Sequence, residues 1–183
     1  MNELILKEIT LNITLRFEKS RDCKDITRIN DLAFGQKNEG ILIEHLRKNR
    51  NFLPELSIVA EKDGIIIGHI LFFPIQIKSI DKSHKSISLA PMAVLPEYQN
   101  QGIGGKLVRY GLKKCREKGY KSVIVLGHPE YYPRFGFKKA SKWGIRQPFD
   151  APDEAFMAIE LVEDGLKGVS GVVEYPEEYS VAL

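Results

Sequence analysis

The stretch from Leu89 to Gly105, LAPMAVLPEYQNQGIGG, decides the fold of this chain. An apolar run ends at Val94, a polar turn containing Pro96 follows, and the glycine-rich segment 99–105 opens a predicted helix. Glycine removes the Cβ atoms that would block a close approach to the backbone. The first turn of a helix offers unpaired N–H groups, and the helix dipole favours an anion there. The stretch therefore predicts a binding site for a pyrophosphate group.

Two common nucleotide-binding motifs are absent from this stretch. A P-loop ends in Gly-Lys-Ser or Gly-Lys-Thr, but here Gly105 and Lys106 are followed by Leu107. The dinucleotide fingerprint requires a third glycine, where Leu107 stands, and an acidic residue about 20 residues further on. Position 122 is a serine. The remaining pattern is Gln-x-x-Gly-x-Gly after a strand.

Length and composition predict one globular domain. The chain has 183 residues, of which 43% are hydrophobic and 28% charged, as in ordinary globular proteins. No signal peptide is expected, and the most apolar stretch, 65–77, is too short and too mixed to span a bilayer. Cys23 and Cys115 form neither a metal-binding spacing nor a disulfide framework, so we expect a cytoplasmic protein without a metal site. We assign residues 1–164 to the domain and 165–183 to an acidic extension of it, whose structure the sequence does not predict.

Acidic and basic residues are unevenly distributed along the chain. The formal net charge is +3, but residues 150–183 contain nine acidic residues and one basic residue, Lys167. Residues 1–149 therefore carry a net charge of about +11. This excess is typical either of a solvated helix face or of a field that attracts a polyanionic ligand. No nucleic-acid partner is expected, because the acidic segment offsets the field and no nucleic-acid-binding motif is present. The basic residues gather on and after the glycine turn: Lys106, Arg109, Lys113, Lys114, Arg116, Lys118 and Lys121.

Apolar periodicity and turn residues predict an α+β order of elements. Asp63 and Gly64, between two β-rich runs, predict a hairpin. Cys115 lies on the inner face of the helix after the glycine turn, which favours core packing over a role as nucleophile. The predicted strands are 11–17, 57–61, 65–80, 86–94, 122–126, one beginning at 135, and 155–162; the predicted helices are 22–34, 41–49, 102–118 and a short one over 129–134, with 35–40 as a mobile connection.

Three features together resemble the GNAT superfamily of acetyltransferases. They are the strand Leu89–Val94 with its following loop, the Gln-x-x-Gly-x-Gly turn, and the segment Tyr131–Phe137, YYPRFGF, which is similar to the family's Tyr-x-x-x-Gly-Phe. The resemblance covers residues 57–137 well and 9–162 loosely. It implies a mixed, mostly antiparallel sheet of six to seven strands with helices on both faces. It also implies a V-shaped split between the fourth and fifth strands.

The resemblance implies that acetyl-CoA lies in this split as the acetyl donor. Backbone groups of the fourth strand would pair with the pantetheine arm as an added strand does. Backbone N–H groups of the glycine turn would hold the pyrophosphate, and Lys106 and Arg109 would meet phosphate charge. The implied cofactor-binding residues are Met92, Ala93, Val94, Gln99, Gln101, Gly102, Gly104, Gly105 and Lys106.

The implied reaction is direct transfer of an acetyl group to an amine of a small molecule or a protein. The Val94 N–H would stabilise negative charge on the carbonyl oxygen. Tyr132 stands at the family's position for the acid that protonates the leaving thiolate. The alternative role for Tyr132 is packing or a hydrogen bond to the cofactor. Tyr131 would point elsewhere on the same short helix, so packing or a place in the pocket wall is favoured for it.

A general base would help, because an alkyl amine is only about one part in a thousand neutral at pH 7. Four residues are candidates, and the sequence does not choose among them. His128, which we take as the catalytic candidate together with Tyr132, ends one wall of the split, where the family often has Asn or Asp. Glu39 and Glu44 could bind substrate instead, and His69 lies in a strand, where a structural role is common.

Other functions and assemblies stay open at this point. A CoA-binding protein of the same fold without turnover is the main alternative to an enzyme. The sequence does not report the depth of the acyl pocket, so a longer acyl donor is compatible with it. The terminal strands could also pair with a second copy of the chain to form a homodimer.

Overall fold

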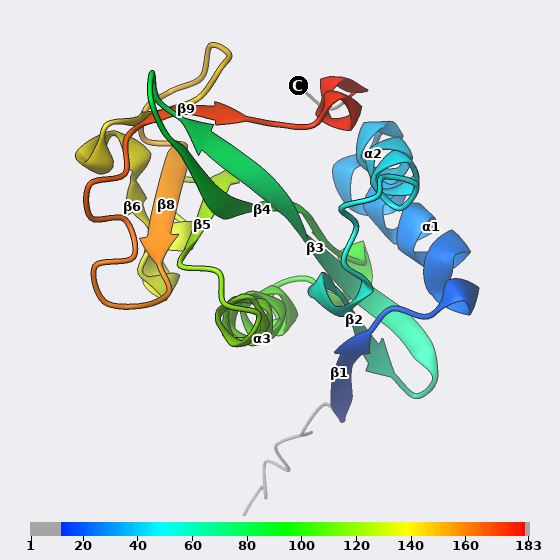
Figure 1. Cartoon of the computed structure of the whole chain (residues 1–183). Helices are drawn as coiled ribbons and strands as arrows, with labels where there is room; N and C mark the ends of the chain where they lie inside the picture. Colours follow the sequence, from blue (N-terminus) through cyan, green and yellow to red (C-terminus); the bar gives the residue numbers. More distant parts are fainter. Residues whose placement is uncertain (1–11, 182–183) are drawn as a thin grey trace, which may run out of the picture.

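The computed structural model describes residues 12–181, which form one nine-stranded sheet flanked by helices (Figure 1). The strand order is β1-β2-β3-β4-β5-β8-β6, and β9 pairs with β3 and β7. All pairings are antiparallel except β4 with β5 and β7 with β9. The strands are β1 (Ile13–Phe17), β2 (Ser57–Lys62), β3 (Ile65–Lys78), β4 (Ser83–Val94), β5 (Ser122–Leu126), β6 (Lys138–Lys139), β7 (Ile145–Arg146), β8 (Phe156–Glu160) and β9 (Gly171–Glu174).

The long strand β3 carries helices on both of its faces, as expected from the resemblance. The helices are α1 (Cys23–Phe34), α2 (Asn38–Leu46) and α3 (Ile103–Glu117). Side chains of a strand alternate between its two faces. Gly68 and Phe72 face α3. A Cβ on Gly68 would lie 3.2 Å from Leu107, and the Phe72 ring occupies the space that a Cβ on Gly111 would need. His69 faces α1, where its ring approaches Asn30.

The split between β4 and β5 has the predicted position. The two strands pair in parallel only at Ile87 with Val123 and at Ser88 with Ile124. Beyond this point β4 bulges, because two residues, Ala90 and Pro91, oppose a single residue of β3. The two strands therefore diverge toward their C-terminal ends, where the glycine turn and α3 follow β4.

The Asp63-Gly64 hairpin is confirmed, whereas the expected connection over 35–40 is wrong. Asp63 and Gly64 both have positive φ and join β2 to β3. Gly35, with φ of 69°, ends α1, and α2 already begins at Asn38, three residues earlier than expected. Gly40 lies inside α2, where the missing Cβ lets the helix pack closely on Asp31 of α1. Packing of α2 on α1 accounts for the early start of α2, and the spacing of apolar residues in the sequence does not reveal that packing.

Some strand boundaries also differ from the expectation. β3 ends at Lys78 instead of residue 80, and the side chain of Ile80 is fully exposed in the turn. β4 begins at Ser83, because the polar residues 83–85 pair with the end of β3. The short predicted helix is a 3-10 turn over Tyr132–Phe135. Leu11, expected in the first strand, lies outside the described residues.

The C-terminal segment packs against the domain over much of its length. β9 pairs with residues 76–78 of β3, whereas β2 pairs with residues 65–71 of the same strand. A 3-10 turn over Glu177–Val181 follows and lies beside α2, where Asn49 donates a hydrogen bond to Glu178 at 2.8 Å. The strands β6, β7 and β9, each two to four residues long, raise the strand count above the predicted six to seven. The division at residue 164 stays a prediction.

Candidate active site

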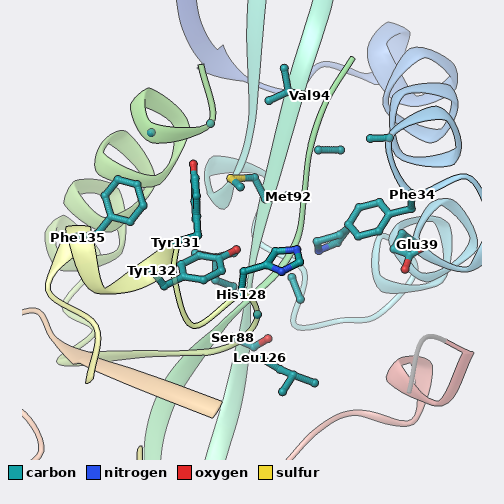
Figure 2. Close-up of a pocket in the computed structure, with 18 of the residues that line it drawn as sticks. Phe34, Glu39, Ser88, Met92, Val94, Leu126, His128, Tyr131, Tyr132 and Phe135 are labelled. Atoms are coloured by element: carbon teal, nitrogen blue, oxygen red, sulfur yellow. The ribbon is translucent and has the colours of Figure 1, made fainter. Parts of the chain in front are cut away.

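A cavity of about 1160 Å³ opens where β4 and β5 diverge. Its longest wall is the end of β4, since every residue from 88 to 94 lines it. The glycine turn, the start of α3, the segment after β5, α1, α2 and the C-terminal segment supply the rest. Figure 2 shows two sides of this cavity, with Tyr131 and Phe135 beside α3 on one side and Phe34 and Glu39 on the other. Met92 and His128 lie between them.

The glycine turn presents the N-terminus of α3 to the cavity. Gly102 has φ of 78° and precedes the first residue of the helix, so a side chain there would strain the backbone. A Cβ on Gly104 would lie 2.7 Å from the Tyr131 hydroxyl oxygen. Gly102, Gly104 and Gly105 all line the cavity. Unpaired N–H groups at a helix N-terminus bind anions, so the turn can hold a phosphate group.

The two glutamines of the motif have different positions. The Gln99 side chain donates to the Val94 carbonyl oxygen at 3.0 Å and lines the cavity, so it fastens the turn to the end of β4. The exposed Gln101 donates to the Glu97 carbonyl at 3.1 Å, and neither Gln101 nor the exposed Lys106 is among the lining residues. Arg109, one helical turn further on, does line the cavity.

The backbone of β4 directs a free N–H group into the split. Leu95 donates its N–H to the Ile67 carbonyl at 2.9 Å, and the neighbouring Val94 pairs with Gly68 in the register. Successive residues of an antiparallel strand direct their N–H groups to opposite sides. The Val94 N–H therefore points away from β3 and toward the gap before β5. Its carbonyl points the same way, which is where Gln99 reaches it.

Tyr132 lies between the end of β5 and the cavity. Its ring packs edge-on against Tyr131 and Phe137, with centroid distances of 5.2 and 5.5 Å. Gly127 makes room for this ring, because a Cβ on Gly127 would overlap it. Burial raises the pKa of the Tyr132 phenol well above its usual value, and the nearby Tyr131 adds to the shift. The phenol is protonated at neutral pH, as an ordinary tyrosine is, and burial makes it a weaker acid.

Two arginines stack on aromatic rings at the side of the cavity next to α3. The Arg134 guanidinium lies 4.5 Å from the centroid of Tyr131, and that of Arg109 lies 5.0 Å from the centroid of Phe135. Arg109 also donates to the Gly105 carbonyl at 3.3 Å. Arg134 likewise donates Nε–H to the Tyr131 carbonyl at 2.9 Å. Stacking and these bonds limit the freedom of both side chains and leave their other N–H groups available to an anion.

Only two of the four candidate bases reach the cavity. His128 and Glu39 line it, whereas the exposed Glu44 bonds Thr27 on the outer side of α1. His69 is fully buried on the far side of β3, with Nε2 at 2.9 Å from the Ser57 hydroxyl. Burial, and secondarily the charge of Arg47, lowers its pKa to about 3, so it is a neutral structural residue.

A sequence model described as the acetyltransferase (GNAT) family matches residues 25–137. This range holds β4, the glycine turn, α3, β5 and the tyrosine segment. The chain belongs to the GNAT family of acetyltransferases.

Similar GNAT proteins come from several bacteria. The chain is 38% identical to the uncharacterized N-acetyltransferase YjhQ of Escherichia coli over 78% of this chain and 80% of that protein. A crystal structure of YhbS of Escherichia coli in complex with CoA has 33% identity and a TM-score of 0.86, and covers 93% of both chains. A GNAT acetyltransferase of Brucella melitensis in complex with acetyl-CoA has 32% identity and a TM-score of 0.75, covering 92% of this chain and 99% of that one. These matches confirm the predicted fold.

Sequence reasoning missed the C-terminal part of this GNAT cavity. Tyr179 and Ser88 share a hydrogen bond of 2.9 Å at the base of the split. Tyr175 packs on Tyr179 at 4.9 Å between centroids, and Phe149 packs on Tyr175 at 5.9 Å. All four residues line the cavity. The aromatic residues of 149–179 are a signal in the sequence, but nothing local shows that this segment crosses to the end of β4.

Cys115 is buried as expected, and burial raises the pKa of its thiol. Across residues 12–181, no cluster of three or more His, Cys, Asp and Glu side chains is placed to hold a metal ion. In the same range, no helix is long and apolar enough to cross a membrane.

Proposed function

We propose that this GNAT acetyltransferase transfers the acetyl group of acetyl-CoA directly to a primary amine of a small molecule or a protein. The observation that supports the donor best is the glycine turn at the N-terminus of α3, which opens into a cavity walled by the free edge of β4. One end of this cavity suits a pyrophosphate and the free strand edge suits an amide-containing arm. YhbS with CoA and the Brucella protein with acetyl-CoA support the same choice of donor.

The residues present fit this donor. The missing side chains at Gly102 and Gly104 leave the backbone open to the pyrophosphate, and Arg109 and Arg134 provide positive charge at the same end. The polar edge of Met92 to Val94 would hydrogen-bond the pantetheine amides. Gln99 would act indirectly, by fixing the turn on the Val94 carbonyl.

Acetyl-CoA supplies an activated acyl group on a thiol leaving group. The Val94 N–H, which has no partner on β3, would donate to the acetyl oxygen as negative charge develops there. The Tyr132 phenol, which like any tyrosine is protonated at neutral pH, would give its proton to the departing sulfur. Its place in the lining of the cavity next to β5 suits this role.

His128 is the proposed base that receives the proton of the amine. It extends into the middle of the cavity, between Met92 and the side that holds Phe34 and Glu39 (Figure 2). It is exposed, so a proton taken from the amine can pass to water. Glu39 is proposed to bind the acceptor instead, since it lies in the first turn of α2, across the cavity from Tyr131 and Phe135 (Figure 2).

Binding of acetyl-CoA, measured by calorimetry, tests the donor site. Gly102→Glu would place bulk and negative charge at the proposed pyrophosphate position, and we expect it to abolish micromolar binding. Gly119→Glu is the matched control, because Gly119 lies at the other end of α3, also has positive φ, and also has open space around a Cβ. Equal losses in the two variants, or no binding by the unaltered chain, would overturn the proposed donor site.

The alternative is a protein that binds the same donor without turnover. It is distinguished by thiol release from acetyl-CoA in the presence of a panel of primary amines. Release that depends on an amine, with the acetylated amine identified by mass spectrometry, supports the enzyme. Binding without release for every amine would favour the binding protein.

A further inference from the structure

We propose that the acceptor is a primary amine carried on an aromatic or apolar body without a carboxylate, bound in its cationic form. This inference rests on the proposed transferase function and assigns its acceptor to the side of the cavity opposite α3. We call this side the acceptor chamber. Its lining residues are Phe34, Glu39, Leu42, Leu126, Phe149 and Tyr175.

The walls of the acceptor chamber are largely apolar. Phe34 at the end of α1 is 44% exposed and Leu126 at the end of β5 is 40% exposed, although both are large hydrophobic side chains. Exposed apolar side chains are common singly, but these two come from separate elements and line the same cavity. An apolar body lying between them would remove both from water.

The C-terminal segment closes the base of the acceptor chamber with aromatic rings. Tyr179 is fixed by its bond to Ser88 and by edge contact with Phe73 at 6.4 Å between centroids. Tyr175 and Phe149 stack outward from it. Aromatic walls favour flat or apolar groups and also stabilise a nearby cation. The chamber therefore favours an aromatic body over a flexible polar chain.

Charge differs between the two sides of the cavity. Glu39 is the only carboxylate among the lining residues, and the two guanidinium groups, Arg109 and Arg134, lie on the α3 side. Glu39 makes no salt bridge within 12–181 and only accepts hydrogen bonds from the Gln36 amide, at 2.9 and 3.1 Å. Its charge therefore remains available to a cation. It would attract an ammonium group and repel a carboxylate on the same molecule.

Steady-state kinetics with four amines test the inference: 2-phenylethylamine, ethanolamine, phenylalaninamide and phenylalanine. We expect kcat/KM for 2-phenylethylamine to exceed that for ethanolamine by about 100-fold, because the phenyl group adds buried apolar area. Phenylalaninamide should exceed phenylalanine by about tenfold, since only the latter carries a carboxylate. Equal values within each pair would overturn the proposed acceptor class.

Two pairs of variants locate the effect. Phe34→Ala should raise KM for 2-phenylethylamine about tenfold without affecting KM for ethanolamine. Leu32→Ala should leave both KM values unchanged, because Leu32 is similarly exposed on α1 but does not line the cavity. Glu39→Gln should raise KM for both cationic amines, whereas Glu44→Gln on the same helix should not. Indistinguishable members of either pair would place the acceptor elsewhere.

Calorimetry separates this inference from the proposed function. The amines are titrated into the protein preloaded with CoA, so that binding is measured without turnover. Preferential binding of 2-phenylethylamine without acetylation would sustain the acceptor chamber and overturn the transferase function. Acetylation of ethanolamine as efficiently as 2-phenylethylamine would sustain the transferase function and overturn the acceptor chamber.

Discussion

The proposed role of Tyr132 as the acid depends on its place in the lining of the cavity, since burial raises the pKa of the phenol and makes it a weaker acid. We predict that Tyr132→Phe lowers kcat about 100-fold or more, as expected for loss of a general acid. The dissociation constant for acetyl-CoA should change less than about threefold, since the ring and its packing are retained. Thiol release at saturating substrates and calorimetry give the two values.

The neighbouring Tyr131 provides the control for this prediction. Its hydroxyl lies next to Gly104 on the α3 side of the cavity, so Tyr131→Phe should affect the KM for acetyl-CoA more than kcat. A Tyr132→Phe variant with an unchanged kcat would limit Tyr132 to packing. The sequence predicted that Tyr131 points elsewhere than Tyr132, and the fold places its hydroxyl beside Gly104.

Gly127 controls the position of Tyr132 from the end of β5. A Cβ added there would overlap the ring and meet its Cδ2 atom at 3.0 Å. Gly127 has no positive φ, so the cost of Gly127→Ala comes from packing alone. We predict a loss of about 1–3 kcal/mol in the free energy of unfolding, together with a fall in kcat as the phenol is displaced. Urea denaturation and kinetics measure the two effects.

A matched substitution distinguishes the loss of stability from the displacement of the Tyr132 phenol. Gly111→Ala also introduces a Cβ that would overlap an aromatic ring, that of Phe72 beneath α3, and Gly111 does not line the cavity. Gly111→Ala should destabilise the chain without the fall in kcat. If Gly127→Ala has normal kinetics, the ring can move without consequence and its position is not important for the reaction.

A buried polar network that joins β2, β3 and the ends of β1 and α2 contains a group that titrates, the His69 imidazole. His69 on β3 bonds Ser57 on β2, and Ser57 donates to Glu18, which pairs with Arg47 at 2.9 Å. Glu18 lies 3.9 Å from His69 but is neutralised by Arg47, so burial dominates and the pKa falls to about 3. The folded state therefore binds no proton here at pH values where the unfolded state does.

The sign of the resulting pH dependence is fixed by this difference. The stability contribution is complete above the unfolded pKa of about 6.5 and is lost as the pH falls toward about 3. We predict that lowering the pH from 7 to 5 removes about 2 kcal/mol through this group. His69→Gln should flatten that part of the profile, whereas His84→Gln, near the start of β4, should not. An unchanged slope in His69→Gln would assign the effect to other groups.

Local patterns predicted the elements whose residues interact with near neighbours. The Asp63-Gly64 hairpin, α3 and β5 follow from turn chemistry and periodicity, and the glycine turn follows from its position after a strand. The start of α2 depends on the contact of Gly40 with Asp31 of the preceding helix. The place of β9 depends on pairing between segments far apart in the sequence, such as Gln76 with Glu174. For the same reason the sequence indicated Tyr132 and His128 but not Phe149, Tyr175 or Tyr179.

Positive and negative charge are separated in the chain as well as in the cavity. The acidic segment 150–183 is partly neutralised by lysines of the sheet, as in the pairs Lys78–Glu174 and Lys139–Asp153. Arg109 and Arg134 are exposed on the side of the cavity next to the glycine turn. A polyanionic donor would therefore approach this side through a positive field that salt weakens.

We predict that the KM for acetyl-CoA rises several-fold between about 50 and 500 mM salt, because the Debye length shrinks from roughly 14 to 4 Å. Arg109→Gln should raise this KM about fivefold at low salt, and the difference from the unaltered chain should disappear at high salt. Arg116→Gln makes the same change of charge on α3 outside the lining of the cavity, so it should have a much smaller effect. Equal effects of the two substitutions would mean that the basic helix acts through its total charge. A KM independent of salt would mean instead that the backbone of the glycine turn, and not the side-chain field, accounts for donor binding.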